Sequence, residues 1–281
     1  MKTIKTLALF CATAIALTSC SDDNDGGASV DLNSAVLFTT NNSDGNVKAF
    51  TFVNSEATSN ATFTTATTAA DGVYFDSNSN TVVQASRTTF GLQGYTGINV
   101  TSGSATATVG VTGSLDMTSP REVAVKGNFY VVADNADADG NDATADGRLF
   151  IYEKSGNAFT LRNTITTDFK LWGITFGGSS GNDLFAVVDA TGDLAVFTNF
   201  LSNTQTSGVA ATKRITIGGI VRTHGLTYDA SSDTMVMTDI AVAMNGGNDG
   251  AFHVITDFSS KFSTTANGGT LSTNDQIRVA G

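Results

Sequence analysis

Apolar and polar residues alternate at strand spacing over most of the chain, and no stretch after residue 20 keeps apolar residues at helical spacing. Four segments share one order: a small residue, an apolar residue, any residue, an apolar or aromatic residue, and then Asp or a turn residue. They are Gly72–Asp76, Glu122–Lys126, Gly173–Gly177 and Gly225–Asp229. The pattern predicts four short β-strands, each followed by a turn. Glu122, Lys126 and Gly177 depart from it, so the two middle units are expected to be less regular.

The four segments recur at a regular interval, since their apolar anchors Val73, Val123, Ile174 and Leu226 are 50, 51 and 52 residues apart. After each comes a second apolar run that ends in a short polar residue: Ser86, Asp134, Asp189 or Asp239. Third strands are expected to begin near Tyr95, Arg148, Asp193 and Gly250. Fourth strands are expected at Ala105–Val111, Thr160–Thr166, Lys213–Ile217 and Gln276–Val279. Four strands at a period of about 50 residues predict the blades of an all-β propeller.

A partial blade precedes these four. Three runs match the second, third and fourth strands of a blade: Ala35–Phe38, Val47–Phe50 and Ala61–Thr67. Its opening strand is missing from this alignment, so we expect residues 34–281 to form four blades and a partial one. Either further blades are lacking at the C-terminal end or the ring stays open. A stack of β-sandwich modules and a β-solenoid are the rival architectures.

The repeat resembles those of NHL-type and lactonase-type β-propellers, in which Gly-apolar-x-apolar-Asp leads to a second strand ending in apolar-x-Asp. The resemblance extends from about Ala35 to the end of the sequence. It implies a fold more than a function, because these families include hydrolases, lyases and binding proteins.

The N-terminus has the features of an export signal. Lys2 and Lys5 precede an apolar stretch, residues 7–17, that is too short to span a bilayer as a stable helix. Leu17–Cys20 resembles a bacterial lipobox, which implies a signal peptide over residues 1–19 and a lipidated Cys20. The acidic stretch that follows resembles the export tag of surface lipoproteins of the Bacteroidetes, although a plain flexible tether over residues 20–33 explains it equally well. We therefore expect a protein anchored by lipid to the outer membrane, on its periplasmic face or at the cell surface.

Cysteine usage and charge exclude several functions. Cys11 leaves with the signal and Cys20 is consumed by lipid, so disulfides, thiolate metal sites and cysteine nucleophiles are excluded from the mature chain. The formal net charge is −11 over the full sequence, and removal of two lysines with the signal makes it more negative. Because the remaining basic residues are scattered, no nucleic-acid binding is expected.

The candidate ligand-binding residues share one position of the repeat, directly before the first strand of each unit, which we call the slot. They are Asp71, Arg121, Trp172 and His224. In a propeller such positions surround the mouth of the central channel, where a polar pocket is expected. The alternative is that these side chains cap strand ends and pair with one another.

The Asp-rich hairpin after the second strand of the second full blade is the candidate metal site. Counting from Asn135, oxygen ligands fall at positions 1, 3, 5 and 12, a pattern that resembles a calcium-binding EF-hand loop. These ligands are Asn135, Asp137, Asp139 and Asp146. The first Asp and the final Glu of that pattern are replaced and no helices flank the loop, so a solvated turn is the alternative.

Motifs for catalysis are scarce. Gly177–Gly181 fits G-x-S-x-G but is predicted to be a strand-to-strand turn. We therefore favour a lipid-anchored propeller that binds a glycan or small molecule over an enzyme. The enzyme alternative is a metal-assisted hydrolase or lyase that uses His224 with Asp71 or Glu122, and a protein-interaction platform is the third reading.

Overall fold

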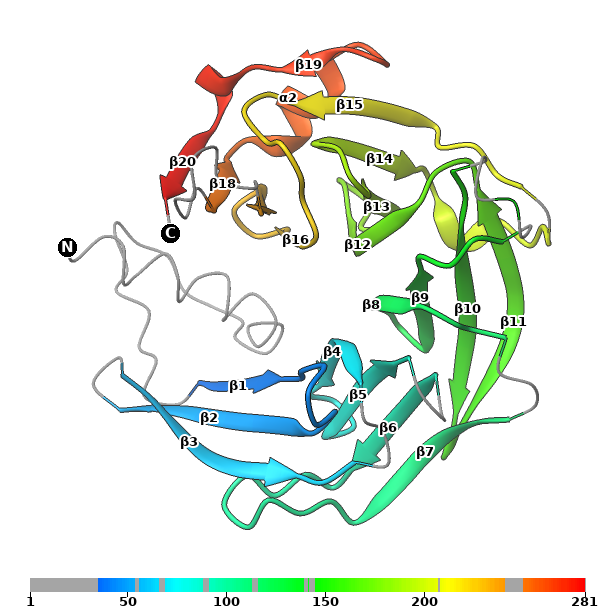
Figure 1. Ribbon diagram of the computed structural model, residues 1–281, viewed down its shortest axis with the longest axis vertical. Helices are drawn as coiled ribbons and strands as arrows, with labels where there is room; N and C mark the ends of the chain where they lie inside the picture. Colours follow the sequence, from blue (N-terminus) through cyan, green and yellow to red (C-terminus); the bar gives the residue numbers. More distant parts are fainter. Residues whose placement is uncertain are drawn as a thin grey trace. The chain divides into compact units, whose positions relative to one another are not determined.

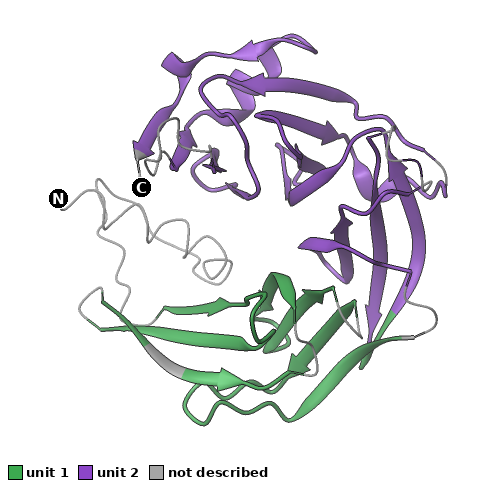
Figure 2. Cartoon of the chain, viewed as in Figure 1, with its two compact units in different colours: residues 1–115, 156–159 green, residues 116–155, 160–281 purple. Residues whose placement is uncertain are grey.

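The computed structural model describes residues 35–53, 56–65, 69–87, 91–112, 116–138, 141, 145–206, 208–240 and 250–280. The predicted signal peptide, Cys20 and the tether lie outside the described residues. The chain divides into two compact units, the first containing residues 1–115 and 156–159 and the second residues 116–155 and 160–281 (Figure 2). Each unit is built mainly from antiparallel strands, so the predicted all-β fold of propeller blades is confirmed.

Unit 1 contains the partial blade, which we call blade 1, and the first full blade, blade 2 (Figure 1). The partial blade has the order β1-β2-β3, with bounds Val36–Thr39, Val47–Val53 and Glu56–Phe63. The full blade has the order β4-β5-β6-β7, with bounds Ala70–Asp76, Thr81–Ser86, Leu92–Thr96 and Ala107–Thr112. Among the predicted strand starts, those of β3 and β6 differ most from the structure. β3 begins at Glu56 because this residue already pairs with Val53 of β2, and β6 begins at Leu92, directly after Gly91, whose φ of 45° favours glycine.

Unit 2 contains the other three blades. Blade 3 consists of β8 (Pro120–Lys126), β9 (Phe129–Asp134), β10 (Gly147–Ser155) and β11 (Ala158–Thr167), whose first two residues belong to unit 1. Blade 4 consists of β12 (Leu171–Gly177), β13 (Asp183–Val188), β14 (Asp193–Phe197) and β15 (Lys213–Ile217), with β19 (Thr270–Leu271) added in parallel to β15. Blade 5 consists of β16 (Leu226–Asp229), β17 (Thr234–Asp239), β18 (Ala251–Ile255) and β20 (Ile277–Ala280). We call the first strand of each full blade its inner strand.

The core of unit 2 lies between neighbouring blades, and β13 shows how. Leu184, Ala186 and Val188 join a cluster shared with blade 3, while Phe185 and Val187 join a cluster shared with blade 5. Both faces of this strand are therefore buried, and its sequence is a continuous apolar run instead of an alternating one. Full burial of each large apolar side chain contributes about 1.5–3 kcal/mol relative to exposure.

Packing also places the inner strands of unit 2 beside one another. β12 contacts β8 on one side and β16 on the other, as Figure 1 shows. The residues at the starts of these three strands are consequently brought close together, which is the feature on which the candidate site depends.

A short helix, α2 (Phe258–Thr264), was not predicted. Phe258 and Phe262 lie one helical turn apart, and both ring centroids are 5.3 Å from that of Phe185. Asp233, in the turn before β17, accepts hydrogen bonds from the Ser259 backbone N–H at 3.0 Å and hydroxyl at 2.7 Å. Two aromatic anchors and one carboxylate thus hold a helix that is too short to show a periodic pattern. No described helix has the length and apolar character needed to cross a bilayer.

Candidate functional site

The four predicted pocket residues occupy equivalent backbone positions. In each full blade, the first residue after the second strand donates its backbone N–H to a carbonyl two residues before the slot. These bonds are Arg87 to Ala69 at 3.0 Å, Asn135 to Ser119 at 2.9 Å, Asp189 to Lys170 at 2.7 Å and Ile240 to Arg222 at 2.8 Å. The slot residues that follow are Asp71, Arg121, Trp172 and His224, so the repeat alignment made from the sequence holds at this point.

A break in strand pairing falls at the slot. The register between the inner and second strands shifts between Ala70 and Val73, between Pro120 and Glu122, and between Leu171 and Ile174. Such β-bulges leave a residue out of the ladder and re-aim its side chain, and they are frequent next to active sites. Because of the bulge, the slot side chain does not have to follow the alternation of side chains between the two faces of the strand.

Three of the four slot side chains form one stack in unit 2. The ring centroids of Trp172 and His224 are 3.6 Å apart, and their planes differ by 3°. The guanidinium carbon of Arg121 lies over the Trp172 ring, 4.1 Å from its centroid. Because β12 lies between β8 and β16, the indole is sandwiched between the guanidinium and the imidazole. The structure therefore brings Arg121, Trp172 and His224 together as predicted. We call these three residues the slot stack.

Gly173 permits this close packing. A Cβ atom at this position would lie 2.6 Å from the carbonyl oxygen of His224 and 2.9 Å from Cδ2 of Leu226. Real Cβ atoms essentially never approach neighbours so closely, so β12 can lie against the start of β16 only where residue 173 has no side chain. The glycine of the repeat is thus explained by a backbone contact between blades.

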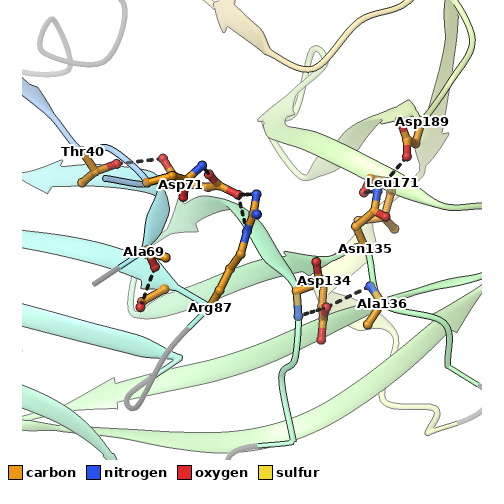
Figure 3. Close-up of polar contacts among 12 residues, drawn as sticks. Thr40, Ala69, Asp71, Arg87, Asp134, Asn135, Ala136, Leu171 and Asp189 are labelled. Atoms are coloured by element: carbon orange, nitrogen blue, oxygen red, sulfur yellow. Dashed lines mark hydrogen bonds and ion pairs between the residues drawn. The ribbon is translucent and has the colours of Figure 1, made fainter. Parts of the chain in front are cut away.

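Polar side chains link the same three blades beside the slot stack. The side-chain amide of Asn135 in blade 3 donates to the carbonyl of Leu171 at 2.9 Å and to Asp189 Oδ2 at 3.2 Å (Figure 3). Arg222, at the start of blade 5, donates to Asp189 Oδ1 at 3.1 Å. Burial raises the pKa of Asp189, but the hydrogen bonds from Asn135 and Arg222 and the charge of Arg222 outweigh it, so the pKa lies below its ordinary value.

Asp71 lies in unit 1 and has its own partners. Its carboxylate is paired with Arg87, whose Nε donates to Oδ2 at 3.0 Å, and it accepts a hydrogen bond from the Asn42 side chain at 2.5 Å (Figure 3). The hydroxyl of Thr40 donates to its backbone carbonyl at 2.8 Å. Glu122, the other carboxylate considered for catalysis, accepts from the backbone N–H of Val123 at 3.1 Å.

Sequence reasoning missed the role of the aspartates that end the second strands. Asp134 accepts backbone N–H bonds from Thr118 and Ser119 at 3.0 and 2.8 Å, and Arg148 pairs with it at 2.8 Å. Asp239 accepts from the backbone N–H groups of Val221 and Arg222 at 3.3 and 3.2 Å. These carboxylates fix the segments that lead into the slots. The sequence showed a short polar residue at the end of each second strand, but it did not show which backbone N–H groups or side chains would bind it.

The candidate calcium loop is only partly described. The Asn135 amide is used in the contacts with blade 4, Asp146 accepts the Ala138 backbone N–H at 2.7 Å, and Asp137 accepts the Asn141 backbone N–H at 3.2 Å. Asp139 lies outside the described residues. Within the described part of the chain, no group of three or more His, Cys, Asp or Glu side chains is arranged to hold a metal ion. Calcium binding here stays a prediction.

Other features of the described chain offer weaker sites. Gly177–Gly181 joins β12 to β13 as a turn closed by the Gly181 N–H to Gly178 carbonyl bond of 2.9 Å, as predicted. A cavity of about 230 Å³ in unit 2 contains Arg214, Asp193 and Thr216, whose side chains bind one another at 2.7–2.9 Å. A cavity of about 370 Å³ in unit 1 is lined by residues such as Phe63, Tyr95 and Thr106. Neither cavity contains a slot residue.

Comparison with protein-family models and with curated proteins gave no match for this sequence.

We expect Gly173→Ala to lower the free energy of unfolding by about 1–3 kcal/mol, because the added methyl group overpacks the contact with the His224 carbonyl. The emission of Trp172 should shift as well, since β12 must move away from β16. Gly110→Ala is the matched control, because a Cβ there meets nothing within 4 Å. Chemical denaturation and tryptophan fluorescence measure both effects, and equal stabilities for the two variants would contradict the interpretation.

Asp189→Asn should lower the melting temperature at pH 7, because it removes the charged acceptor of Arg222. The folded-state pKa of Asp189 is depressed, so its stabilisation is present above the unfolded value of about 3.9 and is lost as pH falls through the folded pKa. The difference in melting temperature between wild type and variant should therefore shrink below pH 4. Asp257→Asn, at an exposed position, serves as the control. A difference that stays constant from pH 7 to pH 2 would refute the ionic contribution.

Proposed function

We propose that this protein is a lipid-anchored ligand-binding β-propeller, and that the blade ends carrying the slot stack form its binding surface for a polar small molecule or glycan. The observation that carries the proposal is the convergence of Arg121, Trp172 and His224 from three different blades. Each of these side chains comes from the same slot of the repeat. A repeated backbone position that carries a different polar or aromatic side chain in each of three units is typical of a binding surface built on a repeat fold.

The stack determines which ligand groups fit. Both faces of the Trp172 ring are covered, so a ligand meets the polar edges of the stack instead of stacking on the indole. Arg121 carries a planar fork of N–H donors, and His224 adds an imidazole whose nitrogens can donate or accept hydrogen bonds. Such groups suit carboxylates and hydroxyls, so acidic sugars and small organic acids fit better than apolar ligands.

Stacking also prepares these groups for binding. A guanidinium packed on an aromatic ring loses little further side-chain freedom when it binds a ligand, because its orientation is already fixed. The polar link from Asn135 through Asp189 to Arg222 holds the three blades in place beside it. This pre-organisation supports binding as the main role, and no observation in the described residues favours the hydrolase or lyase alternative.

Membrane attachment is the second part of the proposal. The positive N-terminal residues, the short apolar stretch and the lipobox-like Leu17–Cys20 support export and acylation of Cys20. Several acyl chains, each CH₂ contributing about 0.8 kcal/mol, would hold the protein firmly at the outer membrane.

Trp172 is the only tryptophan, so its emission reports on the slot stack directly. We expect acidic oligosaccharides or small dicarboxylates to change this emission saturably. Arg121→Gln should weaken the affinity at least about tenfold, or about 1.4 kcal/mol, through loss of the charged donor. Lys48→Gln, which removes one partly exposed positive charge from β2, should leave the affinity unchanged. Equal affinities for wild type and Arg121→Gln would refute the site, and recovery of a cleaved ligand would refute a function limited to binding.

Cys20→Ala should prevent acylation and move the protein from the detergent phase to the aqueous phase in a detergent phase separation. The matched control is Cys11→Ala, which changes the other cysteine of the chain within the predicted signal peptide. It should leave partitioning unchanged. Detergent-phase recovery of Cys20→Ala would show that the anchor lies elsewhere.

A further inference from the structure

Among the described residues, no strand pairs with the inner edge of the partial blade. Its described sheet has the order β1-β2-β3, and β1 pairs with β2 from Val36↔Thr51 to Thr39↔Lys48. In the four full blades, an inner strand lies on the other side of the second strand. β1 corresponds to such a second strand, because Asn41 follows it where Ser86 and Asp239 end β5 and β17. One more strand is needed to give this sheet the composition of the others.

The spacing of residues before β1 matches that of two full blades. A glycine lies nine residues before the first residue of the second strand in blades 2 and 5: Gly72 before Thr81 and Gly225 before Thr234. Gly27 lies nine residues before Val36, the first residue of β1. The match needs no insertion or deletion.

Residue types agree along the same alignment. The first and third residues after the glycine are apolar and the fourth is Asp in all three segments: Val73, Phe75 and Asp76; Leu226, Tyr228 and Asp229; Ala28, Val30 and Asp31. Val73 and Phe75 pack against the cluster around Phe38 in unit 1, and the rings of Phe38 and Phe75 are 4.8 Å apart. Leu226 and Tyr228 pack against the core of unit 2. The alternation therefore marks the partly buried face by which an inner strand packs against the core.

The turn that follows has a defined chemistry. Asp76 accepts the Asn78 backbone N–H at 3.0 Å and the Ser79 hydroxyl at 2.6 Å. Asp229 accepts the equivalent groups of Ser231 and Ser232 at 2.9 and 2.6 Å. These bonds close an Asx-type turn between the inner and second strands.

The same groups recur before β1. Asp31 is followed by Asn33 two residues later and by Ser34 three residues later, so a carboxylate, a backbone N–H and a hydroxyl stand at the same offsets. The segment before β1 thus carries both the strand pattern and the turn that would lead it into β1.

We propose that residues 27–31 form the inner strand of the partial blade, antiparallel to β1. The register of β4 with β5 and of β16 with β17 then gives Asp31↔Val36, Val30↔Leu37, Ser29↔Phe38 and Ala28↔Thr39. The occupant of the open edge is this chain's own segment, since a four-residue turn joins it directly to β1. The chain then contains five blades of the same kind, and Gly26 occupies the slot of the first.

Together with the proposed lipid anchor, this strand shortens the tether to residues 20–26. Seven residue steps separate Cys20 from Gly27 and span at most about 25 Å when fully extended. Blade 1 is therefore held close to the membrane surface. The strand itself does not depend on lipidation, so the experiments below use a chain that cannot be acylated.

Engineered cysteines test the register in the full chain with Cys11→Ser and Cys20→Ser, so that the introduced pair holds the only thiols. The bond from the Thr238 N–H to the Gly225 carbonyl makes Leu226↔Met237 a non-hydrogen-bonded pair. Ala28↔Thr39 is its equivalent, and Cα atoms in such a pair lie about 4.5 Å apart, within reach of a disulfide.

Under mild oxidation, Ala28→Cys with Thr39→Cys should form a disulfide within one chain, detected by peptide mass spectrometry. Ser29→Cys with Thr39→Cys is the control, because neighbouring strand residues point to opposite faces. Cross-linking no greater than in this control would overturn the proposal. A disulfide found only in covalent dimers would overturn it in favour of a strand donated by a second copy.

Proline substitution provides a second measurement that needs no cysteine. Ser29, equivalent to Thr227, is placed in a hydrogen-bonded pair with Phe38, so Ser29→Pro should remove a ladder bond and lower the melting temperature by several degrees. Ser21→Pro changes the same residue type within the tether and should leave the melting temperature unchanged. Equal melting temperatures for the two variants would overturn the proposal, whatever the ligand or the anchor proves to be.

Discussion

Burial of the second strand of each full blade on both of its faces is the constraint on which the structure depends. β5 is buried at every residue, and β13 gives alternate side chains to two different clusters. A strand in this position cannot carry charge along its length, so its charged residues are confined to its ends. There Asp134 and Asp239 are buried, and their carboxylates accept hydrogen bonds from the backbone N–H groups of the segments that enter the inner strands. The fold and the candidate site are joined at these residues.

The slot follows from that junction. A backbone hydrogen bond and a bulge recur in the blades, so the repeat fixes where each slot residue lies, while its identity is free to vary. Gly173 then lets blades 4 and 5 approach closely enough for Trp172 and His224 to stack at 3.6 Å. Ligand binding is proposed at a position whose backbone is set by the repeat and whose side chain can vary from blade to blade. One fold can support many functions in this way.

The proposed inner strand at residues 27–31 extends the same logic to the N-terminus. An unpaired strand edge exposes a row of backbone donors and acceptors and is prone to unwanted pairing. A hairpin from the preceding segment would cover the edge of β1 and would place the membrane anchor a few residues from a blade. Folding and anchoring would then be coupled through a single short segment.

The sequence by itself determined the repeat, the strand types and the slot positions, because strand periodicity, turn chemistry and the Asp at strand ends are local properties of the chain. It also indicated that Arg121, Trp172 and His224 would share one end of the blades. Only the tertiary structure decided that they stack in the order guanidinium, indole, imidazole, and that the Asn135 side chain binds blade 4. These contacts join residues 36 to 52 positions apart in the sequence. The helix α2 was likewise decided by packing, because seven residues held by Phe258, Phe262 and Asp233 are too few for a periodic signal.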